Sequence, residues 1–193
     1  MPMMSSSMAA LTSVAMMLAM MLPSFAPSLW RHHRHLRAMR TPSAALHITL
    51  FAAGYLTIWV TVAYALFALS GALPPLAPWS LGAAIAGAGA VQRSRWKAKQ
   101  LARCRKSCVR APGWRAGRSL GISCALSCAP PMTVLFVAGL MDLRMMLLIT
   151  TAITAERVAP SGVRIARLTG AAALVAGLLV CVGACVRIAI PAL

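Results

Sequence analysis

Acidic residues are almost absent from this sequence: Asp142 and Glu156 are the only two among 193 residues, against 19 Lys and Arg. Hydrophobic residues make up 60% of the chain, and the mean hydropathy is +0.79. A soluble globule needs charged residues over much of its exterior, and this chain has too few to cover one. The composition therefore excludes an ordinary soluble domain and favours a membrane protein.

Charge of either sign is missing from four long segments, residues 1–30, 41–92, 119–141 and 168–186. Seventeen of the 19 basic residues lie instead in three stretches, residues 31–40, 93–118 and 157–167. This is the pattern of a polytopic membrane protein whose basic loops remain in the cytoplasm. The pI near 11.7 would also suit a nucleic-acid binder, but such a protein carries its charge on a folded polar surface. We therefore expect contact with the lipid bilayer and none with nucleic acid.

The uncharged segments have room for six membrane-spanning helices, since one span needs about 20 apolar residues. We predict an all-α bundle forming a single membrane domain over residues 1–193, with spans at about 8–29, 46–69, 76–91, 119–141, 145–158 and 168–190. The basic loops, at about 31–45, 92–118 and 156–167, then face the cytoplasm of a bacterium, and both termini face the periplasm. Candidates for aromatic anchors at the membrane interface are found among Trp30, Tyr55, Trp59 and Trp79.

Two of these spans have alternatives. Only 11 residues separate Arg144 from Glu156, few for a hydrocarbon core about 30 Å thick, so this segment could be a re-entrant hairpin. A hairpin would put the basic residues of 157–167 outside, against the charge rule, and a full span is therefore favoured. The N-terminal segment lacks the basic start and the cleavage site of a signal peptide, so we expect a retained helix, bent or ended near Pro23 and Pro27.

All six cysteines occur in pairs four residues apart: Cys104/Cys108, Cys124/Cys128 and Cys181/Cys185. In a helix this spacing places both thiols on one face, with their Cβ atoms about 5–6 Å apart. Two thiols at that distance can share a soft metal ion, whereas a buried cysteine can also be a small packing residue. The repetition of the spacing keeps both interpretations open.

Methionines give a second indication of soft-metal binding. Met16, Met17, Met20 and Met21 form two i, i+4 pairs in the first expected span. Thioethers select Cu(I), and thiolates select Cu(I) or zinc. Methionine also fills gaps in helix packing, so this pattern too has a structural alternative.

A proline pair follows the second cysteine pair. Pro130 and Pro131 cannot donate hydrogen bonds to the carbonyls of Leu126 and Ser127, which predicts a kink just after Cys128. Carbonyls released at membrane depth need a partner, and Cys124, Cys128 and Met132 could complete a mixed sulfur and oxygen site around an ion. A kink that serves only packing is the alternative.

The predicted topology places these groups at successive depths. Cys104/Cys108 lie at the cytoplasmic face, Cys124/Cys128 lie deeper, the methionines lie near the midplane and Cys181/Cys185 lie near the outer face. A series of weak soft sites is what conduction of an ion requires, so a relay facing the bundle interior is a hypothesis.

The remaining polar residues suggest no catalytic chemistry. Asp142 and Glu156 are expected to pair with Arg144, with Arg157 or with neighbouring loops. The histidines of the first basic segment could complete a cytoplasmic metal site with Cys104/Cys108 or simply be solvated: His32, His33 and His35. We find no nucleophile with a base and no glycine-rich phosphate loop, so the chain is not expected to be an enzyme.

Several stretches resemble the DUF2182 family of predicted metal-binding bacterial membrane proteins, often described as copper-related. They are Ala-Met-Met-Leu-Ala-Met-Met-Leu-Pro-Ser-Phe-Ala-Pro at 15–27, Gly-Tyr-Leu-Thr-Ile-Trp at 54–59, Cys-Arg-Lys-Ser-Cys at 104–108 followed by Pro112, Leu-Phe-Val-Ala-Gly-Leu-Met-Asp-Leu at 135–143 and Glu-Arg-Val-Ala-Pro-Ser-Gly at 156–162.

The family pattern at the fourth span is CxxCCW. Cys124 and Cys128 match its outer cysteines, whereas its middle cysteine is Ser127 here and its tryptophan is Ala129. Asp142 stands where the family usually has Asn, and Arg157 where it usually has Lys.

The resemblance implies a metal-binding, copper-related membrane protein. The favoured hypothesis is that it binds Cu(I) through soft ligands and passes it across the bilayer or to an acceptor, with a copper-accepting or copper-donating protein as partner. The alternative is a structural or assembly subunit of a larger membrane complex with no metal role. The candidate ligands are Cys104, Cys108, Cys124, Cys128, Met17, Met20, Met21 and Met132.

Overall fold

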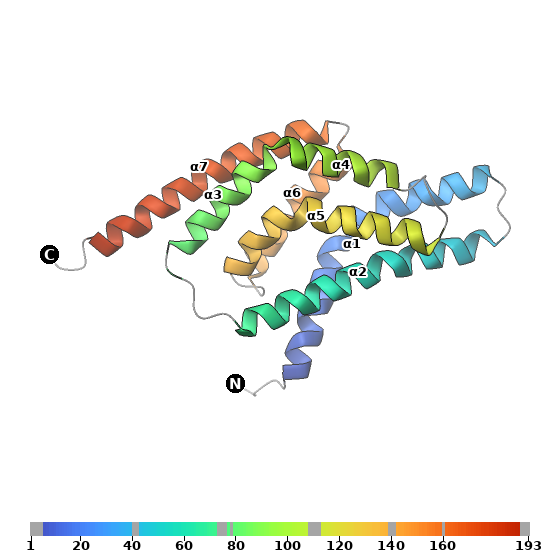
Figure 1. Ribbon diagram of the computed structural model, residues 1–193, viewed down its shortest axis with the longest axis horizontal. Coiled ribbons are helices and arrows are strands. Elements are labelled where there is room, and N and C mark those ends of the chain that lie inside the picture. The colour runs from blue at the N-terminus through green and yellow to red at the C-terminus, as the bar shows by residue number, and fades with distance from the viewer. Residues whose placement is uncertain are drawn as a thin grey trace. The chain divides into compact units, whose positions relative to one another are not determined.

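The structure is a computed structural model that describes residues 6–39, 43–72, 77, 79–107, 113–138, 142–159 and 161–189. These residues form seven α-helices, and no strand lies among them (Figure 1). The expected all-α class is therefore confirmed. The helices are α1 (Ser6–Ala38), α2 (Ala44–Ala72), α3 (Ser80–Gln92), α4 (Arg95–Ser107), α5 (Trp114–Ala138), α6 (Leu143–Val158) and α7 (Gly162–Ala189).

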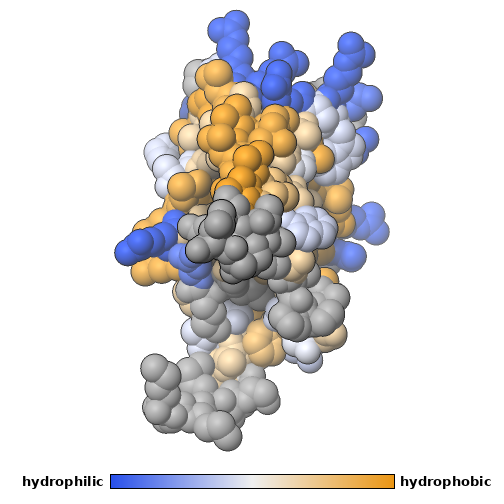
Figure 2. Space-filling model, turned by 90° about the vertical axis from the view of Figure 1, so that its left-hand side faces the viewer, coloured by the Kyte–Doolittle hydropathy of each residue, from blue (hydrophilic) through white to orange (hydrophobic). Residues whose placement is uncertain are grey.

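Four helices are long and apolar enough to cross a membrane. They are Met8–Ala38 in α1, Ala44–Ala72 in α2, Trp114–Ala138 in α5 and Gly162–Val186 in α7. Their outward residues are hydrophobic, as at Leu178 and Leu179 of α7, which are 52% and 68% exposed. Figure 2 shows hydrophobic side chains gathered on the face that it draws, with hydrophilic ones at its top and sides. Lipid-facing helices need this kind of surface.

The predicted count of six spans is not supported. Helix α3 has 13 residues and α6 has 16. At about 1.5 Å per residue they reach roughly 20 and 24 Å, short of a core about 30 Å thick. The segment expected as a basic loop also differs, because residues 95–107 form the helix α4.

Helix α1 is longer than predicted. It continues through Pro23 and Pro27 and into the basic segment, ending at Ala38, and Figure 1 shows it bending along its length. Proline is tolerated inside membrane helices, where neighbouring groups satisfy the released carbonyls. The prolines therefore did not end this helix.

The chain divides into two compact units, Met1–Leu69 with Lys99–Ser127, and Ser70–Ala98 with Cys128–Leu193. Helices α4 and α5 each contribute residues to both units. The single membrane domain stays a prediction.

Aromatic rings form the centre of the first unit. Phe25 of α1 stacks on Tyr55 of α2 with ring centroids 4.2 Å apart, and His32 stacks on Phe51 at the same distance. Tyr55 and Trp59 are at most 1% exposed, so they are core residues and not interface anchors. Trp30 and Trp79, elsewhere in the chain, are exposed, as an anchor would be.

Glycines bring α5 close to α2 in the first unit. A Cβ atom added to Gly54 would lie 3.1 Å from the backbone nitrogen of Arg118, and one added to Gly121 would lie 2.9 Å from the Cβ of Ile58. Small residues of this kind allow membrane helices to approach closely.

In the second unit α3 lies along α7 (Figure 1). Gly82 of α3 faces Cys181 of α7, whereas Gly89 faces Gly170 and Leu174. Because the order along one helix reverses along the other, the two helices are antiparallel. Helix α6 also packs against α7.

Candidate metal centre

Cys124 and Cys128 lie one turn apart in α5 and are 0% and 1% exposed. Their spacing along this continuous helix puts both thiols on one face, as the sequence predicts. No disulfide joins any two of the cysteines that the structure describes.

Cys124 is in contact with a tyrosine. The hydroxyl of Tyr55 and the Sγ of Cys124 form a hydrogen bond of 3.3 Å in the interior of the first unit. The Phe25 ring stacked on Tyr55 holds the phenol in place. Ser127, at the position of the family's middle cysteine, donates its hydroxyl to the backbone carbonyl of Cys124 at 3.0 Å.

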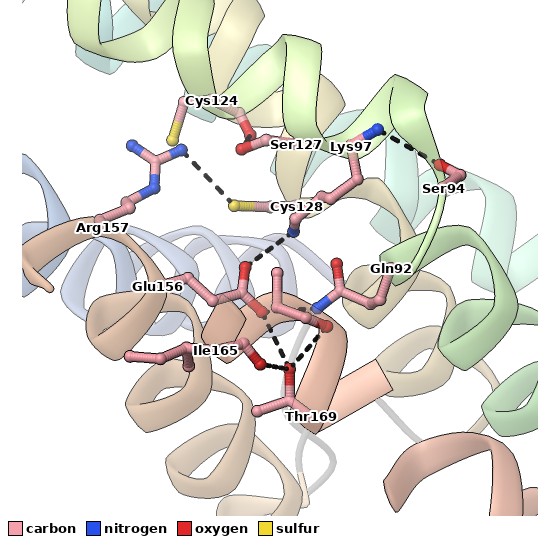
Figure 3. Close-up of polar contacts among 11 residues, drawn as sticks. Gln92, Ser94, Lys97, Cys124, Ser127, Cys128, Glu156, Arg157, Ile165 and Thr169 are labelled. Carbon is pink, nitrogen blue, oxygen red and sulfur yellow. Dashed lines mark hydrogen bonds and ion pairs between the residues drawn. The ribbon is translucent and has the colours of Figure 1, made fainter. Parts of the chain in front are cut away.

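Cys128 has a charged neighbour. The Nη2 atom of Arg157, in the last turn of α6, lies 3.8 Å from its Sγ (Figure 3). Met132 follows one turn later in α5 and is 5% exposed. A thiol, a thioether and a guanidinium are thus found in the same compact unit.

Glu156 is the centre of a buried polar cluster in the second unit (Figure 3). Its Oε2 lies 2.9 Å from the Nζ of Lys97, and both side chains are only 2% exposed. Gln92 donates its Nε2–H to Oε1 at 2.6 Å, and the hydroxyl of Thr169 donates to the same oxygen at 3.3 Å. We call Gln92, Lys97, Glu156 and Thr169 the Glu156 cluster.

These contacts distinguish between the expected partners of the two acids. Glu156 pairs with Lys97, from the basic segment 93–118 that was expected as a loop, and not with Arg157. Asp142 accepts hydrogen bonds from the backbone N–H groups of Arg144 and Met145, at 2.9 and 3.3 Å. It therefore caps α6, as carboxylates commonly do at helix N-termini.

The candidate methionine ligands of α1 are buried. Met17, Met20 and Met21 are 5%, 6% and 1% exposed, on the same buried stripe as Phe25. They therefore face the interior of the first unit, as both the metal-binding and the packing interpretation require.

The cytoplasmic site is not assembled among the described residues. Cys104 is buried on the inner face of α4, and Cys108 lies outside the described residues. His32 is buried against Phe51. Within the part of the chain that is described, no three side chains of His, Cys, Asp or Glu converge as a metal site.

The pair in α7 has different surroundings. Cys181 is half-buried against Gly82, and its Sγ donates to the carbonyl of Trp79 at 3.8 Å. Cys185 is exposed. Cys185 therefore does not face the interior as the predicted relay requires, whereas Cys181 faces α3.

Tyr55 and Arg157 are the polar partners that the sequence did not identify. Tyr55 is 69 residues from Cys124, and Arg157 is 29 residues from Cys128. Both lie in family-like stretches, Tyr55 in 54–59 and Arg157 in 156–162, but the sequence did not pair either of them with a cysteine.

A comparison with known families gives a match over most of the chain. The family model for PpoB2, described as a copper chaperone, matches residues 11–180. The chain belongs to this copper chaperone family. The expected copper-related family is thereby confirmed, and the DUF2182 name stays a prediction. No curated protein and no solved structure matches the chain.

Proposed function

We propose that this member of the copper chaperone family is a membrane protein that binds Cu(I) through sulfur and passes it to an acceptor. The observation that carries the proposal is the buried pair Cys124 and Cys128, one turn apart in α5, with a polar partner on each sulfur. Thiolate ligands select Cu(I) or zinc, the copper chaperone family favours Cu(I), and burial excludes water and competing hard ligands. Copper is cargo in this scheme, so the protein needs no catalytic group and is not an enzyme.

The residues around the pair would hold the sulfurs in position. The hydroxyl of Tyr55 can donate to Cys124 when that sulfur carries charge, and hydrogen bonds of this kind orient metal ligands. Met17, Met20, Met21 and Met132 offer thioethers, which are weaker ligands than thiolates and suit release of the ion. Cys104 and Cys108 are proposed as an entry or exit site at the cytoplasmic end of the protein.

We further propose a bacterial inner-membrane location with the basic segments in the cytoplasm and both termini in the periplasm. The charge distribution supports this orientation. This orientation requires the short helices α3 and α6 to cross together with their flanking residues, and the packing of both against α7 supports their entry into the bilayer. The partners are then lipid and a copper donor or acceptor protein. A reporter fused after Leu193 should read as periplasmic and one inserted in 93–118 as cytoplasmic; the reverse would refute this orientation.

Metal analysis of the purified protein tests the function. Wild-type protein should retain copper when purified under reducing conditions, and Cys124→Ser/Cys128→Ser should lose it. Cys181→Ser/Cys185→Ser is the matched control, because it removes two thiols at the same spacing from a half-buried and an exposed position. A metal-free wild type that co-purifies in fixed ratio with another subunit would favour the structural alternative.

A further inference from the structure

The charge of a loaded thiolate pair depends on the metal. Two cysteine thiolates with Cu(I) carry one net negative charge, whereas the same thiolates with Zn(II) are neutral. Loading of Cu(I) replaces two thiol protons, which leave to water or to the donor's ligands, by one monovalent cation. A net charge away from water is unfavourable unless an opposite charge is close to it. A buried Cu(I) dithiolate therefore needs a counter-cation that a zinc dithiolate does not.

The second unit holds such a cation. Arg157 is half-buried, and its Nη2 atom lies 3.8 Å from the Sγ of Cys128 (Figure 3). Arginine keeps its charge in proteins, and its guanidinium is less strongly hydrated than an ammonium ion. It is therefore suited to a partly buried position beside sulfur.

The neighbouring acid does not cancel this charge. Glu156 directly precedes Arg157, but its carboxylate is 2.9 Å from the ammonium of Lys97 and accepts two further hydrogen bonds, from Gln92 and Thr169. Lys97 and Glu156 offset each other, so these two side chains and Arg157 sum to one positive charge. That sum matches the single negative charge of a Cu(I) dithiolate.

We propose that Arg157 determines metal selectivity by acting as the counter-cation of the Cu(I) complex at Cys128. The inference rests on the proposed function, because the anionic complex requires that Cys124 and Cys128 bind the ion together. Arg157 then favours a monovalent soft ion over a divalent one held by the same two sulfurs. The Lys97–Glu156 pair keeps Glu156 away from Arg157 and preserves this preference.

Selectivity can be measured on the full-length protein in detergent. Cu(I) affinity is obtained by competition with a bicinchoninate chelator and Zn(II) affinity with a pyridylazo dye. Arg157→Gln should lower Cu(I) affinity by about 10- to 100-fold, the effect of losing one charge-assisted contact. Its Zn(II) affinity should change by less than about threefold. Arg157→Lys should stay near the wild type, and Arg164→Gln, an exposed arginine in the same unit, is the control.

A second pair of variants, Cys124→Ser with and without Arg157→Gln, distinguishes an effect of the Arg157 charge from damage to the fold. In a Cys124→Ser background the Cu(I) complex has one thiolate and no net charge, so adding Arg157→Gln should change Cu(I) affinity by less than about threefold. Equal losses of affinity for both metals would overturn the selectivity role of Arg157. So would a loss of Cu(I) affinity of about 10- to 100-fold when Arg157→Gln is added to Cys124→Ser. Wild-type protein without Cu(I) affinity would refute the proposed function itself, and the selectivity role with it.

Discussion

Helices α5 and α7 each carry two cysteines four residues apart, yet their surroundings have little in common. In α5, Cys124 and Cys128 are at most 1% exposed and contact Tyr55 and Arg157. In α7, Cys181 is half-buried against the backbone of α3, and Cys185 is exposed. The spacing makes a shared metal geometrically possible in both helices. Of these two pairs, only the α5 pair is fully buried and has a polar side chain beside each sulfur, whereas Cys181 contacts the backbone carbonyl of Trp79, so the α5 pair is the better candidate.

A glycine in contact with a cysteine indicates close packing of two helices. Gly82 allows α7 to approach α3 at Cys181, so the small size of the cysteine is a sufficient reason for its presence there. At Cys128 the neighbour is a guanidinium, which packing alone does not require. Chemistry is therefore better inferred from the neighbours of a cysteine than from its spacing.

Removing the charge of Lys97 should have the largest effect on stability. It tests whether the buried polar contacts of Glu156 stabilise the fold. Lys97→Met leaves the carboxylate of Glu156 buried without its counter-ion, which should cost about 3–5 kcal/mol. Thermal unfolding in detergent measures the loss. Lys99→Met, an exposed lysine two residues away in α4, should change stability by less than about 0.5 kcal/mol. Equal stability of the two variants would contradict a buried ion pair.

A methyl group added at Gly82 tests whether Cys181 serves close packing between α3 and α7. The new Cβ of Gly82→Ala would lie 2.6 Å from the Sγ of Cys181 and 2.9 Å from the carbonyl oxygen of Gly177, so the helices must move apart. We expect a loss of about 1–3 kcal/mol, measured by the same unfolding experiment. Gly87→Ala has open space at its Cβ and should be neutral or stabilising. Loss of copper in Gly82→Ala at unchanged stability would mean that α7 takes part in binding.

The smallest effect is expected for the hydroxyl of Tyr55. Tyr55→Phe keeps the ring stack with Phe25 and removes one hydrogen bond to Cys124. Cu(I) affinity should fall by about 3- to 10-fold in the chelator competition. Tyr64→Phe, on the exposed face of the same helix, should have no effect. If the two variants bind alike, the phenol positions no ligand.

Much of the fold could be predicted because long uncharged apolar segments are typical of helices long enough to cross a membrane. Uncharged segments between basic clusters gave the all-α class and the location of the four long helices. The start of α3 did not follow from apolarity, since residues 76–79 are as apolar as a span and α3 begins only at Ser80. The short length of α6 was expected, because only 11 residues separate Arg144 from Glu156. Helix α4 was missed because its basic residues resemble a solvated loop, whereas its inner face buries Lys97, Leu101 and Cys104.

The site was only partly predictable for a related reason. Helical spacing places Cys124 beside Cys128, and Met17 beside Met21, without knowledge of other helices. The partners Tyr55, Arg157 and Lys97 come from α2, α6 and α4 and depend on tertiary packing. Glu156 illustrates the difference, since its neighbour in sequence, Arg157, is not its partner, and Lys97, 59 residues away, is.

X-ray absorption at the copper edge of the Cu(I)-loaded protein tests the central claim most directly, because it identifies the atoms bound to the ion. Sulfur ligands are expected in the wild type. The same spectrum is expected after Cys181→Ser/Cys185→Ser, whereas Cys124→Ser/Cys128→Ser should lose the copper signal together with its thiolate shell. A wild-type spectrum with only nitrogen and oxygen ligands, or a thiolate shell that survives removal of Cys124 and Cys128, would contradict it.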